Sequence, residues 1–405
     1  MQTNNENAIQ DSHKDQRVND IEIISFSNRS REDKKLLKRF VNFHWDLYRG
    51  DPQYIPLLDY EYLGFRLIGL TGFFEPRNLF YKHAETEFFL AVRNNQIVGR
   101  CNAFVNHDHN KHWQDKVGFF GQFEAIDDLQ VTEALLKSAR QWLKGKGMDT
   151  MRGPQNMPVN EATPGILSAG FESRPVIYYG YNKPYYEQLM LKSGLEPIKR
   201  VRSWEVPVTN PMEEKLYRVA QKVIQRYDIT IEPWGKRPFN LRCREMFEIY
   251  NDAWTGNFGF VPFQEEEFYT ITEGMRLIMD KGLFQFLYVK GEPAAFMGCI
   301  PNIYEKMAPI PKFRHWEFLR MLKLFLTKGS IKGVRVGYLG VKKKFRRLGL
   351  DGVMIWKQKI YAQNVGYEYS DMGWILEDNL TATRLADMMG SIPSKTYVIF
   401  EQKID

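Results

Sequence analysis

The fold is decided by the stretch Gly340-Val341-Lys342-Lys343-Lys344-Phe345-Arg346-Arg347-Leu348-Gly349-Leu350-Asp351-Gly352. It places a basic turn between a predicted strand (334–341) and a predicted helix (352–363). Backbone N–H groups at a helix N-terminus are unpaired, the helix dipole adds positive charge there, and glycine lets the backbone approach a ligand closely. Lysine and arginine side chains would add charge-assisted hydrogen bonds. The stretch therefore predicts a pyrophosphate-binding turn, and a solvated basic turn that caps a helix is the alternative.

The positive charge of the chain concentrates around this turn. The formal net charge is +7 over 405 residues. Residues 331–350 contain no acid and seven basic residues: Lys332, Arg335, Lys342, Lys343, Lys344, Arg346 and Arg347. The rest of the chain is close to balanced, whereas a nucleic-acid-binding protein would present a broader basic face. We therefore expect an anionic ligand at this segment and no DNA partner.

Two motifs resemble those of the GCN5-related N-acetyltransferase (GNAT) superfamily. Arg346 and Gly349 match its Arg/Gln-x-x-Gly-x-Gly/Ala signature, although Asp351 stands at the final small position and glycine follows one residue later. Downstream, 379–390 resembles the superfamily's Asn-x-x-Ala-x-x-Leu-Tyr-x-x-x-Gly block. The tyrosine of that block is commonly the acid that protonates the departing thiolate. Ala386 replaces it here and cannot donate a proton.

The resemblance implies that acetyl-CoA or a longer acyl-CoA is the donor and that no metal is needed. The expected cofactor-binding residues are Leu339, Val341, Arg346, Arg347, Leu348, Gly349, Leu350, Asp351, Gly352 and Asn379. In that pattern a backbone N–H near 339–341 polarises the thioester carbonyl. Asn379 flanks the pantetheine arm in the superfamily, and its alternative role is to cap a helix.

Acyl transfer to an amine needs a base for the ammonium and an acid for the thiolate. Possible bases are Asp252, Glu292, Asp371 and Glu377, each of which could instead form an ordinary ion pair. Tyr338 and Tyr369 could replace the missing tyrosine or simply pack. Asp252, Tyr338 and Tyr369 are therefore the catalytic candidates. The loop 251–260 should line the acceptor pocket through Trp254, Asn257 and Phe258, and Asn160 and Glu161 are expected to reach the same cleft.

The order of predicted elements repeats once along the chain. Similar hairpins are predicted at 87–105 and 283–300, and Val117-Gly118-Phe119-Phe120-Gly121 mirrors Val336-Gly337-Tyr338-Leu339-Gly340. We predict an α/β (α+β) fold of two GNAT-like domains (21–208 and 209–405), each a mixed, mostly antiparallel sheet flanked by helices, after a disordered tail (1–20). In the first half the corresponding turn, 121–128, has three acidic residues and no basic residue. That half should have lost its cofactor site.

The remaining features limit the partners. Three distant cysteines show no zinc spacing, and His107, His109 and His112 are expected on a solvated loop rather than at a metal. The chain shows no transmembrane run and no secretory signal. Because the three distant cysteines make a disulfide framework unlikely, a reducing, cytoplasmic location is expected. The acceptor should be a small-molecule or lipid amine, with peripheral membrane contact possible. The oligomeric state is not indicated. The alternatives are a transferase like the FemABX family, which uses aminoacyl-tRNA, and a non-catalytic acyl-CoA-binding protein.

Overall fold

The strands and longer helices of the first half follow the predicted order, except for the strand predicted at 176–181. The computed structural model describes residues 20–65, 70–157, 164–211, 214–309 and 316–405. The strands of the first half are β1 (Glu22–Phe26), β2 (Ala84–Arg93), β3 (Gln96–Asn106), β4 (Val117–Ala125), β5 (Thr150–Gly153), β6 (Ile166–Ala169) and β7 (Glu196–Pro207). Its helices are α2 (Arg31–Leu47), α3 (Asp59–Leu63), α4 (His107–Trp113), α5 (Leu129–Gly145) and α6 (Tyr186–Lys192). Residues 1–19, with Asn160 and Glu161, lie outside the described residues.

The second half repeats this order with one additional long helix. Its strands are β8 (Ile229–Pro233), β9 (Phe284–Val289), β10 (Glu292–Pro301), β11 (Gly333–Val341), β12 (Tyr369–Leu376) and β13 (Ile392–Lys403). Its helices are α7 (Glu214–Arg226), α8 (Phe239–Trp254), α9 (Glu265–Met275), α10 (Glu317–Thr327), α11 (Leu350–Val365) and α12 (Leu380–Met388). The additional helix is α7, which precedes β8, whereas α10, between β10 and β11, has a shorter counterpart in α4, between β3 and β4.

Local sequence explains many of these elements. Ser30 caps α2, and Asp33 completes a capping box with the Ser30 backbone. The buried residues of α2 include Leu37, Phe40 and Val41, which follow the helical period. The hairpin between β2 and β3 turns at Asn94-Asn95, where both residues have positive φ, as tight hairpin turns require.

One thirteen-stranded sheet joins the two halves. Its order is β1-β2-β3-β4-β5-β13-β7-β12-β11-β10-β9-β8, with β6 attached to β13. In each half the parallel pair, β4 with β5 and β11 with β12, follows a run of antiparallel strands. This mirrored order supports the duplication seen in the sequence.

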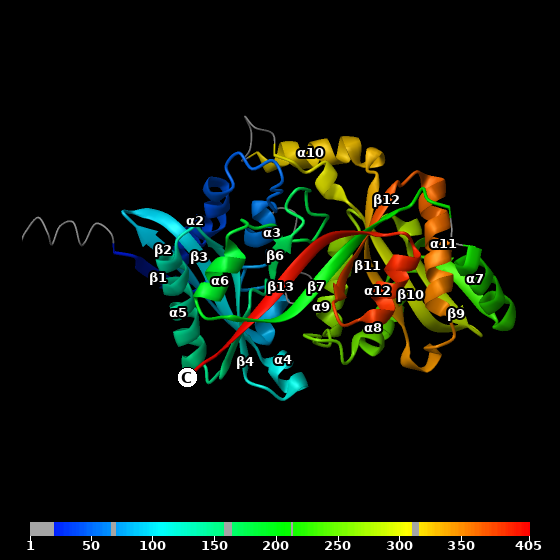
Figure 1. Ribbon diagram of the computed structural model, residues 1–405, viewed down its shortest axis with the longest axis horizontal. Coiled ribbons are helices and arrows are strands. Elements are labelled where there is room, and N and C mark those ends of the chain that lie inside the picture. Colours follow the sequence, from blue (N-terminus) through cyan, green and yellow to red (C-terminus); the bar gives the residue numbers. More distant parts are fainter. Residues whose placement is uncertain (1–19, 66–69, 158–163, 212–213, 310–315) are drawn as a thin grey trace, which may run out of the picture.

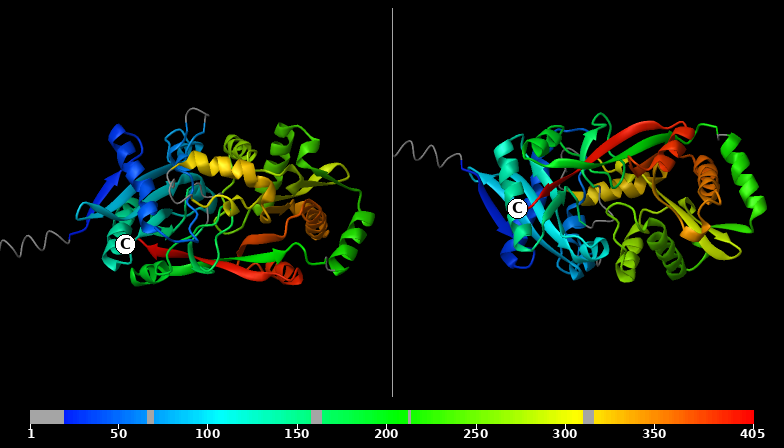
Figure 2. Two further views of the ribbon diagram at one scale, coloured as in Figure 1. Left: turned by 90° about the horizontal axis from the view of Figure 1, so that it is seen from above. Right: turned by 60° about the horizontal axis from the view of Figure 1, so that its bottom comes forward.

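The last strand of each half crosses to the other half. β7 pairs with β12 of the second half, and β13 pairs with β5 of the first half. The two long strands also pair with each other through the middle of the molecule (Figure 1, Figure 2). The predicted fold class is confirmed, and this exchange turns two expected sheets into one. The boundary at 208/209 stays a prediction.

Some predicted local elements are wrong. The predicted strand at 176–181 is a turn, and β6 pairs with β13 instead. The expected loop at His107 to His112 is the helix α4, because Asn106 caps it by accepting a hydrogen bond from the backbone N–H of His109.

Candidate functional site

The basic turn lies between β11 and α11, as predicted. A short 3-10 turn (Lys343–Phe345) leads to Gly349, which has a φ of 77° and is the N-cap of α11. A left-handed conformation of this kind suits glycine. No described side chain caps this helix, so its first backbone N–H groups face the turn without a side-chain acceptor. Arg347 is exposed there, as is Asp351 in the first helical turn. The arrangement offers an anion both the helix N-terminus and guanidinium groups.

The C-terminal end of α8 holds this turn in place. The Asp252 carboxylate accepts a hydrogen bond from the backbone N–H of Lys343, and Arg346 Nη2 donates to the Ala253 carbonyl at 2.7 Å. Trp254 packs on the backbone of β11, where a Cβ on Gly340 would lie 2.4 Å from Trp254 Cζ3. The carboxylate of Asp252 therefore positions the turn, and it stays a candidate base only as a prediction.

β11 and β12 part beyond a short paired stretch. Their parallel pairing runs from Gly333 with Tyr369 to Val336 with Met372. Just beyond it, a register shift against β10 leaves Gly337 as the extra residue of a bulge, because Gly298 pairs with Tyr338 and Cys299 with Val336. Bulges bend a strand and redirect its side chains. We call this opening the second-half splay.

A cavity of about 220 Å³ occupies one side of the second-half splay. We call it the splay cavity. Its lining includes Trp254, Asn257, Phe258, Arg335, Tyr338 and Trp374. The structure thus brings the three residues predicted to bind the acceptor into one cavity with Tyr338, whose hydroxyl lies 3.9 Å from Met275 Sδ. These residues lie together because the 251–260 loop crosses the carboxyl end of β11.

A smaller apolar cavity lies on the other side of the splay. It is lined by Leu339, by Val336 and Met372 of the two parting strands, and by Met389 beside α12. Asn379 caps α12 by accepting from the Ala382 backbone N–H at 3.2 Å. Ala386, at the position of the motif's tyrosine, is fully buried in a cluster with Trp204 and Val206. A larger side chain would not fit there without movement of its neighbours.

Other residues predicted near the cofactor contribute mainly packing. Leu350 is buried in the second-half core, and Val341 and Leu348 pack against that core. Gly352 faces Leu216 of α7, where a Cβ would be in ordinary contact at 3.4 Å. These residues support the basic turn by packing against the core of the second half.

Tyr369 lies away from the splay cavity. Its hydroxyl donates to Glu305 Oε1 and accepts from Asn302 Nδ2, both at 2.9 Å, at the start of β12. Burial and the neighbouring Glu305 carboxylate hold the pKa of Tyr369 above its usual range. Two other possible bases form ion pairs, Glu292 with Lys344 and Glu377 with Arg202.

Asp371 belongs to a buried network behind the splay cavity. Its carboxylate accepts from the hydroxyls of Tyr179 and Ser203. Burial raises the pKa of Asp371 to about 6, against the lowering effect of those hydrogen bonds and of Arg335. The Arg335 guanidinium stacks 4.4 Å from the Trp374 ring centroid. The network links the lining of the splay cavity to Tyr179, which lines the next cavity.

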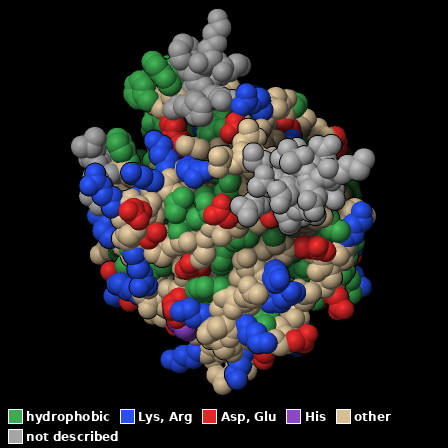
Figure 3. Space-filling model, turned by 90° about the vertical axis from the view of Figure 1, so that its left-hand side faces the viewer, with side chains coloured by type: hydrophobic (Ala, Val, Ile, Leu, Met, Phe, Trp, Pro, Cys, Tyr) green, Lys and Arg blue, Asp and Glu red, His purple; other side chains and the backbone are tan. Residues whose placement is uncertain are grey.

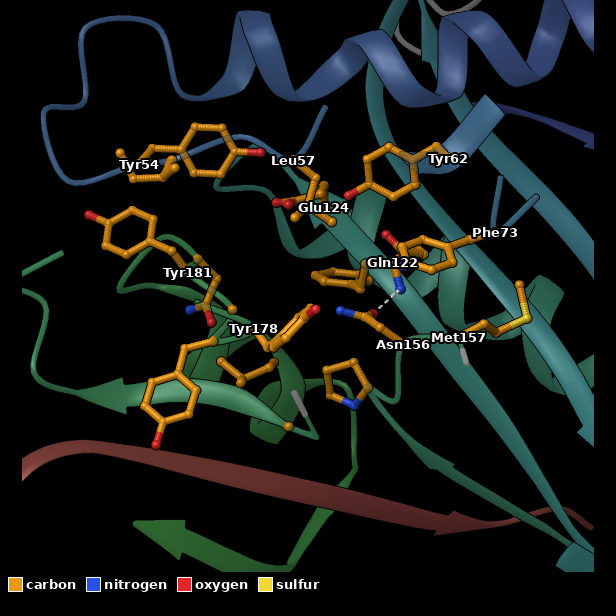
Figure 4. Close-up of a pocket in the computed structure, with 18 of the residues that line it drawn as sticks. Tyr54, Leu57, Tyr62, Phe73, Gln122, Glu124, Asn156, Met157, Tyr178 and Tyr181 are labelled. Carbon is orange, nitrogen blue, oxygen red and sulfur yellow. Dashed lines mark hydrogen bonds between the residues drawn. The ribbon is translucent and has the colours of Figure 1, made fainter. Parts of the chain in front are cut away.

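Sequence reasoning missed that second cavity, which lies in the first half. It has a volume of about 150 Å³ and a mostly aromatic and apolar lining that includes Leu57, Tyr62, Phe73, Met157 and Tyr181 (Figure 4). We call it the first-half cavity. Tyr178, which has a positive φ of 66°, lines both this cavity and the splay cavity. Its lining comes from strands, helices and loops far apart in the sequence, so no local motif signals it.

Polar groups line the end of the first-half cavity that lies beside the carboxyl end of β4. Asn156 Oδ1 accepts from the Gln122 backbone N–H at 2.8 Å (Figure 4). Glu124 Oε2 accepts from the hydroxyls of Tyr48 and Tyr186, both at 2.6 Å. Burial raises the pKa of Glu124, which Arg100 and the two tyrosines oppose. β4, the counterpart of β11, therefore carries a buried acid near its carboxyl end, where the second half has the basic turn.

The histidines on α4 do not gather into a ligand set. Within the described ranges, no group of three or more metal-ligating side chains is found. Burial lowers the pKa of His109 to about 3, so its ring is neutral at physiological pH. Among the described residues, no helix is both long and apolar enough to cross a membrane.

Comparisons with known proteins agree with this architecture. No family model matches the chain. The bacterial ceramide synthase of Caulobacter vibrioides is 28% identical over 377 residues, which cover 91% of this chain and 95% of that protein. Protein YghO of Escherichia coli is 28% identical over 385 residues, 92% of this chain and 94% of that protein. A tandem GNAT protein from the clavulanic acid biosynthesis pathway has a TM-score of 0.54 at 10% identity, covering 95% of this chain and 99% of that one. The chain therefore has the tandem GNAT fold.

Proposed function

We propose that this protein is an acyl-CoA-dependent N-acyltransferase whose acceptor is a long-chain amine and whose reaction takes place at the second-half splay. The observation that carries the proposal is the convergence, at one splay, of the uncapped N-terminus of α11 and a cavity that continues toward the first half. The helix terminus and the exposed Arg347 suit a pyrophosphate. The cavity offers room for an acceptor opposite the donor.

The chemistry needs few protein groups. The neutral amine nitrogen attacks the thioester carbonyl carbon, the carbon–sulfur bond breaks, and an amide and coenzyme A are formed. The nitrogen loses one proton and the thiolate gains one. Tyr338 is the side chain we assign to protonate the thiolate, because it lines the splay cavity and Ala386 cannot take that role.

Two observations support a long-chain acceptor. The relative from Caulobacter vibrioides is named a ceramide synthase, and a ceramide is an amide between a fatty acid and a long-chain amino alcohol. The splay cavity also adjoins the first-half cavity, whose lining is mostly aromatic and apolar, through Tyr178. An amine placed at the splay could therefore extend its alkyl chain past Tyr178 into the first half.

The proposal is tested by titration and turnover with the purified protein. Calorimetry with acetyl-CoA and palmitoyl-CoA measures donor binding, and mass spectrometry detects the amide formed with sphinganine or with a lysine-containing peptide. We expect palmitoyl-CoA to bind and sphinganine to be acylated. Binding without any amide product would support a non-catalytic acyl-CoA-binding protein instead. Failure of both donors to bind would overturn the proposal.

The distribution of charge gives no comparable support to a tRNA-dependent reaction. On the face in Figure 3, the end of the molecule formed by the first half, basic and acidic side chains are interspersed rather than gathered in one basic surface. Binding of tRNA would require a broad positive surface and would weaken steeply with salt. The titration with palmitoyl-CoA therefore comes first.

A further inference from the structure

Helix α10 exposes an apolar face and buries Arg320 on its opposite side. Phe318 and Leu326 are 71% and 77% exposed, and Leu322 and Phe325 are exposed beside them. These residues are spaced at i, i+4, i+7 and i+8, so they share one face of the helix. Exposed contiguous apolar faces of this kind mark interaction surfaces. We call these four residues, with the exposed Trp316 that precedes the helix, the α10 face.

Charged residues attach the opposite side of α10 to the body. Arg320 is fully buried and donates through Nε to the Met307 carbonyl at 3.1 Å and through Nη2 to the Pro56 carbonyl. The Glu317 carboxylate accepts from the backbone N–H of Asp59. These bonds fix the rotation of the helix, because turning it would leave a buried guanidinium without acceptors. The outward direction of the α10 face is therefore built into the fold.

The charges around the α10 face favour an anionic surface. Residues 316–332 contain one acid, Glu317, and one arginine, Arg320, which both face inward, and three lysines, of which Lys332 pairs with Glu368. Lys323 lies on the side of the helix between the apolar and the buried faces, and the exposed Lys328 follows its C-terminus with Nζ 5.8 Å from the Phe325 ring centroid. Apolar side chains flanked by lysines are typical of helices that lie in the interface of an anionic membrane.

We propose that the α10 face docks this protein on the surface of an anionic lipid membrane, with the helix lying in the plane of that surface. α10 runs along the outer edge of the molecule, over the region where the two halves meet (Figure 1, Figure 2). Hydrophobic side chains also project at the top of the view in Figure 3, the edge along which α10 lies in Figure 1.

The anchoring bonds connect this face to the first-half cavity. Arg320 and Glu317 hold the segment from Pro56 to Asp59, and Leu57 within that segment lines the cavity. A long-chain amine could therefore pass from the lipid beside α10 into the first-half cavity without crossing bulk water. This last step rests on the proposed function, whereas docking itself does not.

Vesicle sedimentation tests docking independently of catalysis. The full chain is mixed with vesicles of phosphatidylglycerol and phosphatidylcholine, and with vesicles of phosphatidylcholine alone. The test variant carries Phe318→Ser, Leu322→Ser and Leu326→Ser. These three positions are exposed, so the fold should tolerate the substitutions. A matched control carries Leu277→Ser, Val365→Ser and Val219→Ser, which are also exposed apolar residues.

We expect the parent and the control to sediment with the anionic vesicles, and the α10 variant to bind at least about a hundredfold more weakly. Turnover of a short water-soluble amine should be unchanged in the α10 variant, while turnover of sphinganine held in vesicles should fall. If the parent docks but acylates neither amine, docking stands and the proposed function fails. Equal sedimentation of the α10 variant and the parent would overturn docking. So would a dimer that forms without lipid and is abolished by the three serines, because a second copy would then cover the face.

Discussion

In both halves of the sheet two parallel strands separate and leave an opening. The two openings differ in how much space they contain. In the first half β4 and β5 part after Phe119 pairs with Arg152, and in the second half β11 and β12 part after Val336 pairs with Met372. A Cβ on Gly121, at the first opening, would lie 2.0 Å from the Gln155 carbonyl oxygen. A Cβ on Gly337, at the second, would lie 3.5 Å from Ile300 Cδ1. The first opening is filled by backbone, and the second has space.

The helices that follow these openings, α5 and α11, differ in how their N-termini are capped. Asp128 caps α5 by accepting hydrogen bonds from the backbone N–H groups of Gln130 and Val131, and its carboxylate also pairs with Arg93. Gly349 caps α11 without a side chain. A carboxylate at the N-terminus takes the place that a phosphate would occupy. One side chain thus separates a helix that is satisfied internally from one that can accept an external anion.

The comparison teaches that a duplicated fold can divide the work. The second half keeps the opening at which we propose that the donor binds, while the first half fills its own opening and supplies most of the lining of the first-half cavity. The exchange of β7 and β13 links the two, because neither half completes its sheet alone. We expect the following changes to test this division, beginning with the largest effect.

Charge reversal at the basic turn should abolish donor binding. Lys343→Glu with Arg347→Glu removes two cations beside the N-terminus of α11, both of them exposed. Each lost charge-assisted contact is worth about 1.5–3 kcal/mol, so the Kd for palmitoyl-CoA should rise about a thousandfold. Isothermal calorimetry measures this.

The control for that experiment is Lys192→Glu with Lys236→Glu, which changes the net charge equally at exposed positions away from the turn. It should bind palmitoyl-CoA as the parent does. If both pairs weaken binding alike, the attraction is long-range and the turn is not the donor site.

Tyr338→Phe should reduce turnover rather than binding. The hydroxyl is the proposed proton donor to the thiolate, and such groups contribute about a hundredfold or more to kcat. The Kd for palmitoyl-CoA should stay unchanged, because the ring that lines the cavity remains. Steady-state kinetics and calorimetry on the same preparation separate these effects. A parallel Tyr369→Phe variant should keep the parent's kcat, and the reverse result would exchange the roles of the two tyrosines.

Narrowing the first-half cavity should discriminate between acceptors by length. Leu57→Trp adds volume to a lining residue. We expect KM for sphinganine to rise about tenfold and KM for a six-carbon amine to stay constant, which acceptor kinetics will reveal. Leu191→Trp, an exposed position on α6, serves as control. An equal effect of Leu57→Trp on KM for both amines would show that the alkyl chain of the acceptor does not occupy this cavity.

The sequence predicted the turn between β11 and α11 because the determinants of that turn are contiguous. The basic turn, Gly349 and the loop 251–260 lie in short segments whose residues act together. The likeness between Val117 and Val336 gave the wrong register, however, because Val117 pairs at the start of its parallel stretch, where Gly333 does in the second half. Gly-aromatic strand patterns resemble each other at several offsets.

The parts that were missed depend on contacts distant in the chain. The strand exchange is a choice between partners that local pattern cannot distinguish. The helix α10 has its apolar side outward, so its periodicity does not identify a core-facing helix. The first-half cavity needs residues near 57, 122, 156 and 178 to meet, and only the tertiary structure brings them together.

Buried carboxylates behind the two openings should affect stability rather than activity, through a dependence of the free energy of unfolding on pH. Asp371 has a pKa of about 6 in the folded protein and a usual value of 3.8. Between about pH 4 and 6 the folded state keeps a proton that the unfolded state has lost, so stability falls as pH rises through this window. The full change is about 3 kcal/mol. Urea unfolding at pH 4.5, 5.5 and 7 should show the slope in the parent, and Asp371→Asn should flatten it. Glu124→Gln is the matched variant in the first half, since burial raises the pKa of Glu124 as well. A slope that survives Asp371→Asn and disappears in Glu124→Gln would place the titrating carboxyl behind the filled opening rather than the open one.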